Sequence, residues 1–234
     1  MNTWTIVLAV ELIVFVIALL VTFYVLFATY QYLKENDLFY LHVLFLYPSF
    51  WQALSATLGL VYITQAWQDV WFILNSFFEI LGTAFTLVYL NRILKLYFRK
   101  TGTSYSLFNY PVLFFDLAAV ILCLVGLIQL TSTFVYYKAG VVVLTSCFVI
   151  LEIVTIVNLL SSPHKKFFGL ITVANTLMVA NGAYYIYIAF NEIMLFQWAN
   201  YILFVVLVFV TKFVCLAMAP FMVSSLTSIG GKEE

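Results

Sequence analysis

Seven long apolar runs occupy most of this 234-residue chain, and only short polar stretches separate them. Each run can cross a bilayer as a helix, which takes about 20 apolar residues at 1.5 Å rise per residue. Apolar residues make up 65% of the chain and charged residues 9%, whereas roughly a quarter of a soluble domain is charged. The sequence therefore predicts an all-α, polytopic membrane protein with a single seven-helix transmembrane domain over residues 1–234. The predicted spans are roughly 4–32, 38–65, 70–97, 108–131, 133–161, 166–191 and 197–223.

The charged residues between the runs predict the orientation of the chain. Eight of the ten basic residues lie in the last turns of the first, third, fifth or last span or shortly after it, and they are Lys34, Arg92, Lys95, Arg99, Lys100, Lys165, Lys166 and Lys232. The opposite loops offer only Asp69 and Glu192. Because basic residues gather on the cytoplasmic side of membrane proteins, we expect the N-terminus outside and the C-terminus in the cytoplasm. The expected location is a cell membrane, in multi-pass form.

Several classes of function are disfavoured by composition. Zero net charge gives no argument for nucleic-acid binding. The three cysteines fall inside apolar runs without CxxC spacing, which indicates buried thiols rather than a disulfide framework or metal site. The chain shows no metal-ligand cluster, nucleophile–base set or phosphate loop. We therefore predict a protein that is not an enzyme and has no metal or catalytic residue.

Lys212 lies in the middle of the last apolar run. A charge at that depth costs about 3 kcal/mol on insertion scales, so it usually faces the bundle and has a partner. Since no acidic residue lies three or four positions away on its own helix, the partner must come from another helix. By counting residues from the span ends, we place Asp116, Glu152 and Asn175 near the same level. The predicted partner is Glu152 or Asp116, with Asn175 as hydrogen-bonding support.

A second layer of charges lies nearer the outer side, roughly 10–15 Å from the first by helix rise. It contains Lys138, which we expect to pair with Glu79 or Glu11. The two layers have two interpretations. They are either satisfied ion pairs that fix helix register, or functional groups that form a route for protons or ions, or a covalent site at Lys212.

The sixth span carries small and amide residues on one face. Ala174 and Asn181 are seven positions apart, as are Asn175 and Gly182. Such residues let another helix approach closely and bond across the interface, so the pattern predicts at least a helix-packing face.

The overall pattern resembles the microbial (type I) rhodopsins. Shared features are seven spans, an outward N-terminus, short loops and a lone lysine in the last helix, where FVVLVFVTK ends at Lys212. Pro48 in the second span is also compatible with the family. The resemblance implies that Lys212 binds retinal as a Schiff base and that Glu79 is the counter-ion candidate. The family's carboxylate four residues before the lysine is Val208 here.

Three functional classes remain open at this point. The first is an opsin-like receptor or a proton- or ion-translocating protein built around Lys212. The second is a small-solute transporter of three-plus-one-plus-three helices, which would share this topology. The third is a non-catalytic subunit of a larger membrane complex. The expected partners are the lipid bilayer and other membrane subunits or a second copy of the chain, and retinal is the one cofactor suggested.

Overall fold

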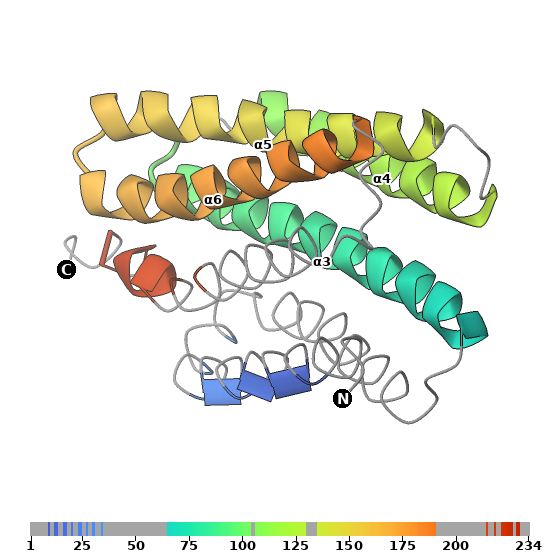
Figure 1. The fold of residues 1–234 in the computed structure, drawn as a ribbon. Helices are drawn as coiled ribbons and strands as arrows, with labels where there is room; N and C mark the ends of the chain where they lie inside the picture. Colours follow the sequence, from blue (N-terminus) through green and yellow to red (C-terminus); the bar gives the residue numbers. More distant parts are fainter. Residues whose placement is uncertain are drawn as a thin grey trace.

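The structure is a computed structural model, and it shows an all-helical chain (Figure 1). It describes residues 65–103, 106–129 and 135–190, single residues between 9 and 34, and positions 214, 218, 221–226, 228 and 229. Side chains are described for 80–103, 111–126, 135–187 and 190 within the long helices. No strand occurs in this part of the chain. The other residues, including the second predicted span and most of the seventh, lie outside the described part.

Four long helices match the third to sixth predicted spans. They are α3 (Gln65–Lys100), α4 (Ser106–Gln129), α5 (Val135–Ser161) and α6 (Lys165–Phe190). α5 contacts α3, α4 and α6, while α4 and α6 do not contact each other. Consecutive helices run antiparallel along one another, as the short connections predict (Figure 1).

α3 is longer than its predicted span at both ends, because polar residues continue the helix beyond the apolar run. It ends where Gly102 takes a left-handed φ of 69°. The amide of Gly102 donates to the Arg99 carbonyl, and that of Thr103 donates to the Phe98 carbonyl. This is a Schellman cap, in which glycine avoids the steric penalty of a left-handed residue.

Two of the described helices are long and apolar enough to cross a membrane, Val135–Ser161 and Lys165–Tyr187, and Pro111–Gly126 is a shorter apolar helix. The surface of α5 is as apolar as its packed side. Its exposed large side chains include Val149, Ile150, Ile153, Ile156, Val157 and Leu160. A helix that is apolar all round suits either a protein core or a membrane, and here one side is not covered by protein. The described part of the first predicted span is also helical, with exposed Leu20, Phe23 and Phe27.

α4 and α5 approach closely through small residues. A Cβ added at Gly140 of α5 would lie 2.8 Å from both the Ala119 carbonyl oxygen and the Cys123 amide nitrogen of α4. Further along the same seam, Gly126 faces the backbone of Tyr137. Cys123 is a free, buried thiol, as is Cys147, so the prediction of buried thiols is confirmed for these two. Cys215 lies outside the described residues.

α5 and α6 are joined by a short loop at residues 162–164, where Ser162 and Pro163 predict a helix stop. Further along, Gly182 of α6 packs against Thr145 of α5, because a Cβ there would lie 2.5 Å from the Thr145 hydroxyl oxygen. Ala174, Asn175 and Asn181 are fully buried. The prediction of a packing face is confirmed for Asn175 and Gly182, whose neighbour is α5.

Candidate functional site

Glu152 lies on the α6 side of α5, and both of its carboxyl oxygens have a partner on α6. Asn175 donates from Nδ2 to Oε2 over 2.7 Å. The Thr176 hydroxyl lies 2.6 Å from Oε1. By helix rise, Glu152 is roughly 14 Å from the C-terminal end of α5. A partly exposed carboxyl group in the middle of an apolar helix is thus held by two side chains of a second helix.

Asn175 links the two helices twice. Besides Glu152, its Nδ2 donates to the Phe148 carbonyl oxygen over 2.8 Å. The side chain is fully buried, and its Oδ1 has no hydrogen-bond partner among the described groups. Both hydrogen bonds of the described network come from its amino group, and these two bonds position the amide between the helices. The structure therefore brings together two of the predicted site residues, Glu152 and Asn175.

Asp116, the other predicted acid, lies on a different side of α5. Its side chain is 5% exposed, and it interacts electrostatically with Cys147 of α5. Oδ1 has no hydrogen-bond partner within the described chain. Cys147 and Glu152 are separated by about 140° around α5, so the two carboxyl groups belong to separate places in the bundle.

The remaining predicted site residues are only partly accounted for. Lys212, Glu11 and the side chain of Glu79 lie outside the described residues, so their pairing and retinal attachment stay predictions. Lys138 is described, and its Nζ lies 5.7 Å from the centre of the Phe190 ring. This cation–π contact holds the ammonium near the N-terminal end of α5 and the C-terminal end of α6.

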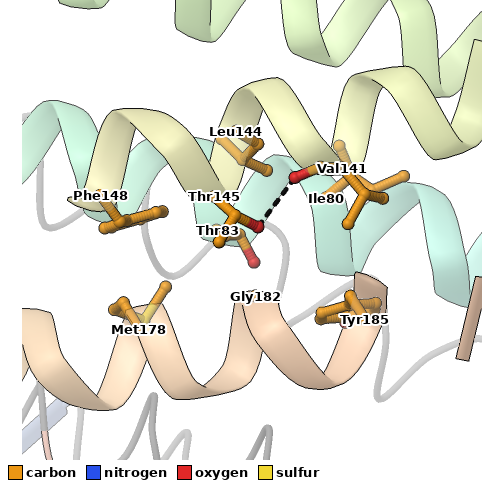
Figure 2. Close-up of a pocket in the computed structure, with 9 residues that line it drawn as sticks. All are labelled: Ile80, Thr83, Val141, Leu144, Thr145, Phe148, Met178, Gly182 and Tyr185. Carbon is orange, nitrogen blue, oxygen red and sulfur yellow. Dashed lines mark hydrogen bonds between the residues drawn. The ribbon is translucent and has the colours of Figure 1, made fainter. Parts of the chain in front are cut away.

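A small cavity of about 20 Å³ lies between α3, α5 and α6. Thr83 and Thr145 border it from α3 and α5, and Gly182 forms its floor on α6 (Figure 2). The Thr145 hydroxyl already donates to the Val141 carbonyl, 2.8 Å away. A cavity of this size holds about one water molecule, which needs about 10–15 Å³.

The C-terminal ends of α3 and α5 and the N-terminal end of α6 are tied together by Tyr97. Its hydroxyl lies 2.9 Å from Ser162 Oγ and 3.0 Å from His164 Nδ1. Its ring stacks on Phe167 at 4.9 Å between centroids. Lys100 then donates to the Leu226 carbonyl over 3.2 Å, and Leu226 is fully buried. The C-terminal segment therefore lies at the same end as the loop between α5 and α6 (Figure 1).

Tyr97→Phe is expected to lower the free energy of unfolding by about 1 kcal/mol, because it removes the hydroxyl and keeps the stacked ring. The measurement is thermal stability of the detergent-solubilised protein. Tyr136→Phe is the matched control, since Tyr136 is 48% exposed. Equal stabilities of the two variants would contradict a structural role for the Tyr97 hydroxyl.

Sequence reasoning did not find Thr176, Tyr97 or the glycine seam between α4 and α5. Thr176 directly follows the predicted site residue Asn175 in the sequence, and this adjacency is the signal that could have identified it. The seam could be found from small residues at 119, 123 and 126, spaced by about one helical turn. Within the described ranges, no group of three His, Cys, Asp or Glu side chains is placed to hold a metal ion.

The fold and the site define an all-helical protein with two helices of membrane-spanning length and a hydrogen-bonded carboxyl group between them. Comparison of the chain with protein-family models, curated proteins and solved structures finds no match.

Proposed function

We propose that this protein is a seven-span integral membrane protein that carries protons or small cations through its helix bundle, with Glu152 as the exchanging group. The observation that carries the proposal is the Glu152 carboxyl, which is hydrogen-bonded to α6 at mid-helix depth. Ionisable residues inside membrane helices are costly and mark ion pathways, proton relays or ligand sites. Lys212 is the proposed cationic member of the same inner layer.

The path of the chain supports an odd number of spans. α6 runs away from the end where Tyr97 meets His164. The C-terminal segment is back at that end, where Lys100 bonds to Leu226. About 30 residues connect Phe190 to Phe221, enough for one more helix across a bilayer. Exposed Arg99, Lys100, Lys165 and Lys166 share this end, which supports the proposal that it faces the cytoplasm.

Retinal binding at Lys212 would be the opsin-like form of this proposal. The cavity between the described faces of α3, α5 and α6 measures about 20 Å³, whereas pockets for organic ligands measure about 300–1,000 Å³, so this cavity is not itself a retinal site. Lys212 lies outside the described residues, and retinal attachment stays a prediction. A visible absorbance band that hydroxylamine bleaches, and that Lys212→Ala abolishes, would confirm it.

A non-catalytic membrane subunit is the second candidate. The observation in its favour is the wide apolar surface of α4 and α5, on which Phe114 and Phe115 are 68% and 50% exposed. Both lipid and another membrane protein would cover such a surface. Purification in mild detergent with a partner at fixed stoichiometry would favour the subunit.

The main proposal is tested by proton uptake into liposomes that contain the purified protein. A potassium gradient with valinomycin supplies the membrane potential, and a trapped pH-sensitive dye reports the uptake. The wild type is expected to take up protons, and Glu152→Gln is expected to lose most of this flux because an amide cannot exchange a proton at neutral pH. Glu192→Gln, in a predicted outer loop, is the control and should retain the flux. Flux no greater than that of empty liposomes, or full flux in Glu152→Gln, would overturn the proposal.

A further inference from the structure

We propose that the end of the bundle where α3 meets α6 binds the headgroup of an anionic phospholipid, whose acyl chain lies along the exposed edge of the α5–α6 pair. The proposal goes beyond ion transport, because it concerns the surface of the helices and not the carboxyl group between them. It depends on a group of basic side chains, on the apolar surface beside them, and on the proposed cytoplasmic orientation of this end.

The junction of α3 and α6 is strongly basic. Residues 92–103 and 161–169 carry six basic residues and no acidic one. Tyr97 and His164 join the two helices, because the Tyr97 hydroxyl lies 3.0 Å from His164 Nδ1 (Figure 1). Shortly after these two residues in the sequence come four exposed basic residues, Arg99, Lys100, Lys165 and Lys166. Their positive charges therefore gather at one junction, and Lys and Arg side chains bind phosphate groups through charge-assisted hydrogen bonds.

The exposed edge of the α5–α6 pair is apolar up to this junction. It consists of Ile156 and Leu160 of α5 and Gly169 and Val173 of α6, and the three side chains are 40%, 76% and 50% exposed. The two helices face each other here, because a Cβ added at Gly169 would meet only Leu159 Cδ1, at 3.9 Å. Since Gly169 has no side chain, an acyl chain has room to lie against the α6 backbone at this point. Lipid is the expected cover of such an apolar surface on a membrane-spanning helix.

Lys165 connects the basic junction to the apolar edge. It lies four residues before Gly169 and eleven before Thr176, so these three residues share one face of α6. On that face Gly169 lies next to Leu159, and the Thr176 hydroxyl lies 2.6 Å from Glu152 Oε1. Lys165 therefore stands at the end of the edge along which the acyl chain would lie, where the phosphate of the same lipid would be.

Charge selects the kind of lipid. The cytoplasmic leaflet contains anionic lipids, and basic groups between membrane helices on that side bind their headgroups. A zwitterionic lipid with the same acyl chains would make the same apolar contacts, but it would bring a cationic group toward the basic side chains. An anionic phospholipid is therefore the occupant that matches both parts of the surface.

Native mass spectrometry of the full chain in detergent tests the proposal. The protein is mixed with equal amounts of phosphatidylglycerol and phosphatidylcholine that carry the same acyl chains, and wild type is expected to retain phosphatidylglycerol preferentially. Lys100 also donates to the Leu226 carbonyl, so the test replaces Lys165 and Lys166. The double variant Lys165→Gln and Lys166→Gln should weaken phosphatidylglycerol retention about fivefold for each residue replaced. Retention of phosphatidylcholine should not change, since the apolar edge is intact.

The control variants separate the position of the charges from their number. Lys165→Arg with Lys166→Arg keeps both charges and should retain phosphatidylglycerol as wild type does. Lys138→Gln removes one positive charge near the opposite end of α5 and should keep the wild-type preference. Glycerol phosphate, which carries the phosphate without acyl chains, should not displace the bound lipid.

Four results would overturn the proposal. They are equal retention of the two lipids by wild type, an unchanged preference in the double glutamine variant, an equal loss of preference in Lys138→Gln, and displacement of the lipid by glycerol phosphate. Proton flux does not enter this test, so failure of the transport proposal would leave the lipid site standing.

Discussion

Gly140→Ala is expected to lower the free energy of unfolding by about 1–3 kcal/mol, the usual cost of adding a methyl group to a well-packed interior. Alanine normally stabilises a helix relative to glycine, by about 1 kcal/mol. At this position the new Cβ would lie 2.8 Å from two backbone atoms of α4, at Ala119 and Cys123. Backbone atoms cannot rotate away, so α4 and α5 must separate and lose contacts along the seam.

Gly169→Ala is the matched control for this prediction, because its new Cβ would meet only Leu159 Cδ1, at 3.9 Å. This variant should be as stable as the wild type or slightly more stable. Both are measured as thermal unfolding in the same detergent. Adding Cys123→Ala to Gly140→Ala should not restore stability, because the conflicting backbone atoms remain. A double variant with wild-type stability would show that the thiol alone limits the approach of the helices.

The positions of the helices could be predicted from sequence because hydropathy and helix rise fix where a span begins and ends. The predicted spans 133–161 and 166–191 differ from α5 and α6 by at most two residues. The same argument predicts depth along the membrane normal, and Glu152 and Asn175 do lie at one level. The glycine cap of α3 was not predicted, because polar residues that extend a helix beyond the apolar run leave no hydropathy signal.

The rotation of each helix about its own axis could not be predicted from the sequence. A helix that is apolar all round gives no preference for one face, so depth alone made Asp116 and Glu152 equal candidates for one site. In the structure Asp116 is buried on α4, whereas Glu152 is hydrogen-bonded to Asn175 on α6. The Thr176 contact depends on the same rotation and on a side-chain angle. Helix rotation and side-chain angle depend on tertiary packing. Small residues such as Gly140 and Gly182 influence that packing, because they allow particular helices to approach closely.

Asn175→Leu is expected to lower the free energy of unfolding by about 1–3 kcal/mol, because it removes two hydrogen bonds between α5 and α6 and leaves Oε2 of Glu152 without its donor. Asn158→Leu is the matched control. Asn158 donates to Val154 in its own helix, so its loss leaves contacts between helices intact and should cost less.

A double-mutant cycle separates the Asn175–Glu152 bond from the loss of shape. Glu152→Leu, Asn175→Leu and the double variant should give a coupling energy between about 0.6 kcal/mol, the average for hydrogen bonds between membrane helices, and about 1.7 kcal/mol, the largest measured value. Repeating the cycle with Glu152→Gln should give almost no coupling change, because glutamine keeps the acceptor for Asn175. If Glu152→Gln removes the coupling as fully as Glu152→Leu, then the bond requires a negative charge on Glu152.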